Sequence, residues 1–413
     1  MIRVLQYDDA QDLVTRKAVR LAEAERAVAP ILEAVRTRGD AGLLEYARKF
    51  DRFEGGDFRV SRAECDAARD RLSPDFLTAV DQAAANIRAY AALQLPPEKS
   101  VEYPDGRRLG QIVRPLDAMG AYIPAGRYPL PSTLLMTAIP AQVAGVRRRA
   151  VVCPKPSPEI LGICSILDVE EVYRIGGAQA IAALAYGTET IPRVDRIVGP
   201  GNIYVAAAKK LIAGEVGIDF IAGPTEIVII AAEADPSFIA ADMLAQAEHD
   251  VDASAILLTT SAGLAAAVAD QVERQLAVLP TAEVARPAID RNSAIVVVAA
   301  MEQAVAFSNA LAPEHLSIHD ASLIPAIRHA GSIFVGPYSP EAAGDYASGP
   351  NHVLPTSGAA RLRGGLSAAD FVKVISVQEL TPSALTQLTP AITSLARAEG
   401  LEAHARSVEV RNA

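Results

Sequence analysis

Apolar residues recur at two different spacings along the chain, and the spacing changes near residue 109. Over residues 22–37 and 73–95 they recur at helical spacing among charged residues, so residues 1–100 are expected to be helical. Ser73 and Pro74 supply an N-cap and a first-turn proline for the second helix. Residues 109–116 have the period of a strand, and a Pro- and Gly-rich bend over 121–132 precedes an apolar helix from Thr133.

Beyond this helix, short β-rich runs alternate with alanine-rich helical runs. Strands are expected at residues 150–153, 172–175, 196–198, 226–230, 255–258 and 294–298. Helices are expected at residues 178–186, 203–213, 240–249 and 262–279. This alternation predicts parallel sheets with helical crossovers, the α/β class. From residue 367 the pattern is mainly helical and too short for a large core, so this tail is expected to pack elsewhere, such as on a second subunit.

The composition of the chain argues against nucleic-acid and membrane partners. The chain has 413 residues, half of them apolar, which allows two or three domains. A formal net charge of -10 argues against a nucleic-acid partner, because binding phosphates needs clustered Lys and Arg. Acids and prolines interrupt every long apolar run, and the first residues do not form a signal peptide, so no membrane partner and a cytoplasmic location are expected.

Two glycine-rich turns stand at predicted strand-to-helix junctions, Gly-Gly-Ala-Gln at 176–179 and Gly-Pro-Gly-Asn at 199–202. Backbone N–H groups at such helix starts can bind an anionic ligand. The same turns need glycine for backbone reasons alone, and the side chains of Gln179 and Asn202 could simply cap the helices. No G-x-G-x-x-G follows a predicted strand, so the usual dinucleotide-binding fingerprint is absent.

Residues able to bind a metal or move protons lie in two regions. On the predicted helix 240–249, Gln246 and His249 are three residues apart and share a face, although a lone histidine there is more often solvent-facing. The polar stretch 312–356 contains the adjacent pair Glu314 and His315, expected on a turn or helix start.

Further along the polar stretch, Asp345 and His352 flank a Gly-Pro-Asn bend, and such groups on irregular backbone can converge on one atom. By themselves, Glu399 and His404 give little indication of a functional site. If Gln246, His249, Asp345 and His404 met, they would offer nitrogen and oxygen but no sulfur, a set that suits catalytic Zn²⁺.

Taken together, these motifs resemble histidinol dehydrogenase, the family that carries out the last two steps of histidine biosynthesis. The resemblance runs from about Ala22 to the C-terminus and is strongest over residues 173–180, 198–205, 246–249, 312–316 and 344–356. It implies catalysis by Glu314 and His315. The zinc ligands that it implies are Gln246, His249, Asp345 and His404, with His404 supplied by the neighbouring subunit of a swapped homodimer.

The resemblance also implies the binding residues. NAD contacts are expected from Tyr122, Gln179 and Asn202. Contacts to L-histidinol are expected from Thr225, His352 and Glu399, together with His315 and the zinc ligands Gln246, His249, Asp345 and His404. Where Thr225 stands, the family usually has serine.

The fold implied is two incomplete Rossmann-like domains with parallel sheets, in a domain-swapped homodimer. Residues 22–121 and 226–366 would form the first, with the zinc and catalytic motifs, and residues 122–225 the second, which binds NAD. Residues 1–21 and the mainly helical 367–413 would be extensions.

The activity implied is the NAD-dependent four-electron oxidation of L-histidinol to L-histidine through bound L-histidinaldehyde. One alternative is a zinc-dependent NAD alcohol dehydrogenase of the same fold that acts on another small polar alcohol. A substrate panel would separate these two. The other alternative is a zinc hydrolase in which Glu314 activates water, and it differs in needing no NAD⁺.

Overall fold

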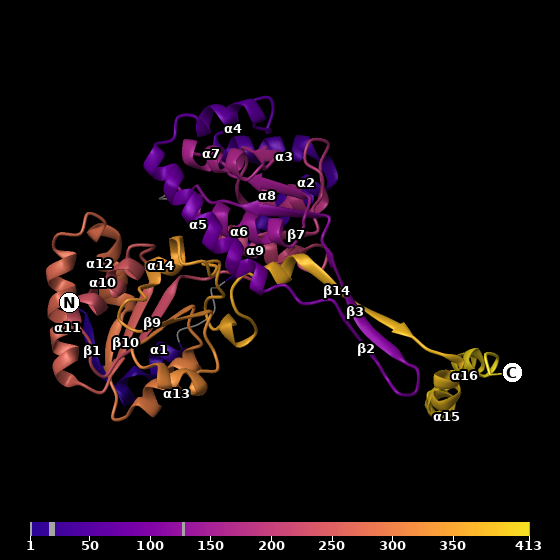
Figure 1. Ribbon diagram of the computed structural model, residues 1–413. Coiled ribbons are helices and arrows are strands. Elements are labelled where there is room, and N and C mark those ends of the chain that lie inside the picture. The colour runs from indigo at the N-terminus through magenta and orange to yellow at the C-terminus, as the bar shows by residue number, and fades with distance from the viewer. Residues whose placement is uncertain (1, 16–20, 126–128, 413) are drawn as a thin grey trace.

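The computed structural model describes residues 2–15, 21–125 and 129–412. Its body consists of two parallel sheets covered by helices, and a narrow antiparallel arm extends from the body (Figure 1). The α/β class with parallel sheets is therefore confirmed. Within the described ranges, no helix has the length and apolar character needed to cross a membrane.

The first sheet has six parallel strands whose central members are buried on both faces. Their order is β1 (Arg3–Gln6), β11 (Ala294–Val297), β10 (Ser254–Thr259), β9 (Glu226–Ile230), β12 (His315–Ile318) and β13 (Ser332–Val335). One face packs on α10 (Pro236–Ala247), α11 (Ala262–Leu276) and α12 (Ala282–Asn292). The other packs on α1 (Gln11–Thr15) and α13 (Met301–Leu311). Cover on both faces explains why the strands are continuous apolar runs.

The second sheet has five parallel strands. Their order is β6 (Glu171–Tyr173), β5 (Arg148–Val152), β4 (Ala118–Tyr122), β7 (Arg196–Val198) and β8 (Gly217–Ile218). One face packs on α4 (Arg62–Arg69), α5 (Pro74–Leu93), α6 (Pro131–Val143) and α7 (Pro158–Ile166). The other packs on α2 (Leu21–Arg38), α3 (Asp40–Tyr46), α8 (Gly177–Tyr186) and α9 (Ile203–Ile212).

Both sheets have the same strand order. Counted along the chain, the five strands of each run 3-2-1-4-5, and β1 adds one strand at the edge of the larger sheet. This is the Rossmann order without its last strand. The order reverses between β9 and β12 in one sheet and between β4 and β7 in the other. Such switch points are where open α/β sheets bind ligands.

The helices between residues 21 and 93 pack on the five-stranded sheet, which corrects the expected grouping of residues 22–121 with residues 226–366. Val28 in α2 lies in one core with Val152, and Ile87 in α5 lies in another with Met119. Likewise β1, from the expected extension 1–21, pairs with β11. An amphipathic stripe shows that a helix is buried but not on which sheet.

The arm consists of three antiparallel strands, β2 (Lys99–Glu102), β3 (Arg108–Pro115) and β14 (Val372–Glu379), in the order β14-β3-β2. Beyond β14, the helices α15 (Pro382–Ala398) and α16 (Glu402–Glu409) form its tip, away from both sheets (Figure 1). The tail expected to be mainly helical thus contains an eight-residue strand, which the sequence analysis missed. Residues 3–6 are likewise a strand, not a helix.

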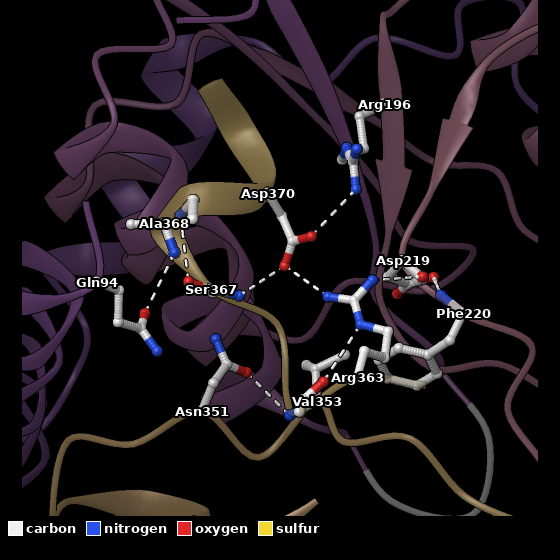
Figure 2. Close-up of polar contacts among 12 residues, drawn as sticks. Gln94, Arg196, Asp219, Phe220, Asn351, Val353, Arg363, Ser367, Ala368 and Asp370 are labelled. Atoms are coloured by element: carbon white, nitrogen blue, oxygen red, sulfur yellow. Dashed lines mark hydrogen bonds and ion pairs between the residues drawn. The ribbon is translucent and has the colours of Figure 1, made fainter. Parts of the chain in front are cut away.

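The base of the arm is tied to the five-stranded sheet by charged side chains (Figure 2). Arg363 Nη2 lies 2.6 Å from the Asp370 carboxylate, and Arg196 Nη1 on β7 lies 3.4 Å from it. Arg363 Nη1 also donates to the backbone carbonyl of Asp219, at 2.7 Å. These contacts fix the direction in which the chain enters β14.

We expect Gly42→Ala to destabilise the protein. Gly42 lies in α3, and a Cβ there would be 2.2 Å from the backbone oxygen of Ala34 in α2. Because neither backbone can move freely, overpacking should lower the free energy of unfolding by about 1–3 kcal/mol. Thermal unfolding followed by circular dichroism measures the change.

The matched control is Gly263→Ala in α11, where a new Cβ meets only Ser261 Oγ at 3.7 Å. Alanine favours a helix by about 1 kcal/mol over glycine, so this variant should be neutral or stabilised. Equal effects of the two substitutions would show that the close approach of α2 and α3 is unimportant.

Candidate active site

The amino edge of the six-stranded sheet gathers polar side chains from neighbouring strands. Thr225 immediately precedes β9, and Glu314 and His315 lie at the start of β12. Because β9 and β12 are parallel, with His315 opposite Ile227, the three side chains meet at one edge. The Glu–His pair therefore stands at a bend and a strand start, and not at a helix start.

Two helices add further residues to this edge. Helix α10 starts after Asp235, which caps it, and ends at Ala247, so Gln246 lies in its last turn and His249 beyond it. This corrects the expected helix 240–249. The second helix, α14 (Glu341–Tyr346), follows β13 and presents Glu341 and Asp345, four residues apart.

His249, Glu341 and Asp345 form a group that could hold a metal ion. One ligand atom from each lies within 4.8 Å of the others, and His249 Nε2 is 3.7 Å from Asp345 Oδ2. Gln246 lies next to the same group, and its side-chain amide is oriented so that both its oxygen and its nitrogen have hydrogen-bond partners. Its nitrogen then donates to Glu341 at 2.9 Å, and its oxygen lies 2.7 Å from Thr225 Oγ1.

Glu341 is the site residue that the sequence analysis missed. Its side chain is only 2% exposed, which is rare for a carboxyl group without a partner of opposite charge. The signal was its spacing: Glu341 starts a short helix after a proline and lies one turn before Asp345 on the same face.

The site concentrates acidic groups. Burial raises the pKa of Glu314 to about 8, against the hydrogen bonds from Thr225 and the Glu226 N–H. Burial, and then the charges of Asp345 and Glu314, raise the pKa of Glu341 well above its ordinary value. Burial alone would raise the pKa of Asp345 too, but the His249 contact and neighbouring histidines hold it below the ordinary range.

A divalent cation fits this charge and this donor set. Imidazole nitrogen with carboxylate and amide oxygens suits Zn²⁺. A cation would also offset the mutual repulsion of the carboxylates. In addition, Gln246 lies at the C-terminal end of α10, where the helix dipole favours positive charge.

His315 is arranged as a neutral base. Its Nδ1 lies 3.3 Å from the Glu226 carbonyl oxygen, which can only accept a hydrogen bond, so a proton on Nδ1 satisfies this contact. Its Nε2 is buried with no hydrogen-bond partner among the described residues. Burial lowers the pKa of His315 to about 4, so at neutral pH Nε2 offers a free lone pair.

His352 joins this edge to the other sheet. Its Nδ1 lies 2.8 Å from the Asp345 carbonyl oxygen, and its Nε2 lies 3.3 Å from Thr133 Oγ1 in α6, the helix that follows β4. Beside it, the Asn351 amide donates to the Met136 carbonyl at 2.6 Å. The site therefore lies where the amino edge of one sheet meets the helix that starts at the carboxyl edge of the other.

The expected cofactor residues lie at the carboxyl edge of the five-stranded sheet. The Tyr122 hydroxyl accepts from the Gly177 N–H at 3.1 Å, and Gln179 donates to Asp51 at 3.0 Å. Asn202 Oδ1 accepts from two N–H groups of α9, so it is a helix cap, the simpler of its two expected roles. Gln179 makes no such cap. Tyr122 and Asn202 stand beside the switch point between β4 and β7.

Glu399 and His404 do not join the other site residues within this chain. Both are exposed and lie at the tip of the arm, where α15 and α16 meet (Figure 1). Of the four expected zinc ligands, the structure brings together Gln246, His249 and Asp345. The expected bend over residues 121–132 includes the end of β4, and residues 126–128 lie outside the described ranges.

Fold and site together are those of an α/β enzyme of the dehydrogenase type, with Rossmann strand order and a buried imidazole beside a group that could hold a metal ion. The model of the histidinol dehydrogenase family matches residues 14–412. The chain belongs to this family. It therefore acts as a histidinol dehydrogenase, an oxidoreductase of histidine biosynthesis.

Individual relatives agree over almost the whole chain. The histidinol dehydrogenase of Geobacillus kaustophilus is 50% identical over 94% of each chain. That of Rhizobium meliloti is 48% identical over 98% of this chain and 96% of its own. The crystal structure of histidinol dehydrogenase from Elizabethkingia anophelis superposes with a TM-score of 0.94 at 38% identity, covering 99% of this chain and 98% of that one.

We expect His249→Ala to abolish tight metal binding. Removing a ligand should weaken Zn²⁺ binding by more than about a hundredfold, since loss of an outer-shell partner alone weakens it by up to that factor. Metal content after gel filtration, measured by mass spectrometry, tests this.

His329→Ala is the matched control, because His329 lies outside the site and should leave the metal content unchanged. Full metal content in the His249 variant would remove this residue from the ligand set.

Proposed function

We propose that the protein oxidises L-histidinol to L-histidine in two NAD-dependent half-reactions, with L-histidinaldehyde bound between them. The observation that carries this proposal is the buried, unpartnered Nε2 of His315, which lies 3.9 Å from Asp345 Oδ1 and hence beside the metal-binding group. A buried imidazole nitrogen that has no hydrogen-bond partner can accept a proton from a bound substrate.

Zn²⁺ is the proposed metal, with Gln246, His249 and Asp345 as ligands and the fourth ligand from His404 of the partner subunit. Bound there, it would supply a Lewis-acid anchor for nitrogen atoms of the substrate. Glu341, beside the ligands, would compensate part of the metal's charge and accept a hydrogen bond from Gln246.

His315 is the proposed base of the first half-reaction. Its Nε2 takes the hydroxyl proton of the carbinol while hydride leaves for the nicotinamide. The Glu226 carbonyl, 3.3 Å from Nδ1, holds the ring in the tautomer that this step needs. Because the imidazole starts neutral, no proton must be removed from it first.

Glu314 is the proposed base of the second half-reaction, in which water adds to the aldehyde. A base works best with a pKa near the working pH, and burial places the pKa of Glu314 at about 8. Thr225 Oγ1 lies 2.5 Å from Glu314 and 2.7 Å from Gln246. Thr225 is therefore the proposed link between this base and the metal ligands, and it also faces the substrate.

The proposed roles of the remaining binding residues are based on the sheet edge at which each residue lies. Tyr122, Gln179 and Asn202 are proposed to bind NAD at the carboxyl edge of the five-stranded sheet. His352 is proposed to bind the substrate from between the two sheets, where its Nε2 reaches Thr133. A second hydride acceptor can then replace the first without release of the aldehyde.

The arm supports a homodimer in which each tip reaches the other subunit. Val374, Ile375 and Val377 on β14 and Leu395 on α15 are exposed, an apolar surface unusual for a free monomer. A dimer would bury this surface and bring His404 and Glu399 of the partner subunit to the metal and the substrate. We also propose that the protein is cytoplasmic, as expected from its sequence.

The direct test is the stoichiometry of the reaction. With L-histidinol limiting and NAD⁺ in excess, the protein should form two NADH for each L-histidine, followed by absorbance and chromatography. One NADH per substrate, with release of the aldehyde, would contradict the two-step proposal. Turnover without NAD⁺ would favour a zinc hydrolase, and preference for another alcohol would favour the other dehydrogenase.

Mixing two inactive variants tests the shared site. His315→Asn removes the base and should lower turnover by about 10²–10⁴-fold with zinc retained. His404→Ala should lower it through loss of the ligand from the arm. After subunit exchange at equal amounts, half of the dimers are mixed and each has one intact site, so activity should return to about a quarter of wild type.

Exchange itself is verified by native mass spectrometry with one variant tagged. Mixed dimers that form without any recovery of activity would show that His404 acts within its own chain or not at all.

A further inference from the structure

A buried ion pair stands beneath the proposed cofactor crevice. Lys209 lies in the last turn of α9, and Asp219 directly follows β8. The side chains of Lys209 and Asp219 are 3% and 1% exposed, and the ammonium and the carboxylate are in contact. Neither residue belongs to the reaction as proposed above.

The pair holds one glycine by both of its backbone polar groups. Asp219 Oδ2 accepts a hydrogen bond from the Gly199 N–H at 2.7 Å. Lys209 Nζ donates to the Gly199 carbonyl at 3.0 Å. Each charged group thus makes a strong hydrogen bond to the same residue, so the two peptide planes at Gly199 are fixed together.

On its other side, Gly199 lies against the end of β4. Its φ is +110°, and a Cβ there would be 2.3 Å from the Tyr122 carbonyl oxygen. Only glycine fits this gap. Gly199 is therefore held between the Tyr122 carbonyl and the ion pair.

The turn that contains Gly199 occupies the switch point. Gly199 follows β7, and Tyr122 ends β4, the two strands between which the order of the sheet reverses. The turn leads directly to Asn202 and the N-terminus of α9. A dinucleotide bound at the carboxyl edge would meet this backbone, so the direction of its N–H groups decides how well they reach the ligand.

Stability alone is a weak reason for the pair. Removing two charges from water is unfavourable, and apolar residues of similar volume often stabilise such a position equally well. The pair is also anchored to rigid parts: Asp219 Oδ1 accepts from the Phe220 N–H at 2.7 Å, and its carbonyl accepts from Arg363 (Figure 2). Such anchoring is what fixing a ligand-binding backbone requires.

We infer that Lys209 and Asp219 are positioning residues for the dinucleotide cofactor. They hold the 199–202 turn in its binding conformation before the cofactor arrives, so binding does not have to order it. This inference rests on the proposed use of NAD at the β4–β7 switch point. It assigns the pair an effect on cofactor affinity and none on the metal or the alcohol substrate.

The test is the double substitution Lys209→Met with Asp219→Asn, which removes both charges and leaves none unpaired. The matched control is Lys210→Met with Glu25→Gln. It removes the neighbouring ion pair on α9, which is 2.6 Å long and does not touch Gly199. On each variant we would measure the Kd for NADH by calorimetry, the KM values for NAD⁺ and histidinol, the zinc content and the apparent Tm.

The Kd and KM for the dinucleotide should rise about ten- to a hundredfold in the Lys209/Asp219 variant, as expected for loss of a hydrogen bond to a charged group. Zinc content and the KM for histidinol should stay at wild-type values. The control should match wild type in all five quantities. Faster amide hydrogen exchange confined to the peptide containing residues 199–205 would support the same conclusion.

Unchanged dinucleotide affinity in the folded variant would overturn the inference. So would loss of the fold in both the double variant and Lys209→Met alone, since the pair would then serve stability. A wild-type protein that binds no NADH would instead contradict the proposed cofactor, which keeps the two failures distinguishable.

Discussion

The active site depends on carboxyl groups buried around a neutral imidazole. Glu314 and Glu341 are almost fully buried beside His315, and Asp345 is mostly so. Among the described residues, no lysine or arginine forms an ion pair with these three acids. Buried acids without a counter-charge stay protonated or bind a cation. The amino edge of the six-stranded sheet is therefore suited to hold a metal ion, and it also contains the proposed bases Glu314 and His315.

The two sheets share one strand order but use opposite edges. In the five-stranded sheet the proposed cofactor crevice lies at the carboxyl ends of β4 and β7, as expected for open α/β sheets. In the six-stranded sheet the acids and His315 lie at the amino ends of β9 and β12, and the returning helix α10 brings Gln246 there. His352, bonded to Thr133, spans the junction. Under the proposed function, hydride donor and acceptor would therefore approach from different sheets, each with its own core.

Much of this architecture could be predicted from the sequence where local pattern determines the structure. The apolar run 226–230 is β9 with the predicted ends, because a strand buried on both faces leaves a continuous β-branched signal. β14 was missed because its residues are mostly exposed and find their pairing partner in β3, far away in the chain. Glu341 was missed because burial of a lone acid is decided by tertiary packing. The sheet on which α2 packs could not be predicted either, because the spacing of apolar residues shows which face of a helix is buried but not what that face contacts.

The arm links assembly to activity under the proposed dimer. Within one chain the metal-binding group is open on the side where His249 is 44% exposed, while His404 is exposed at a distant tip. A ligand supplied across an interface can complete the site only when two chains have paired. Arg363 and Asp370 fix the base of the arm, and Arg363 also contacts Asp219, which holds the proposed cofactor turn. Displacement of the arm base would then disturb the turn at Gly199, so correct seating of the arm and binding of the dinucleotide should favour each other.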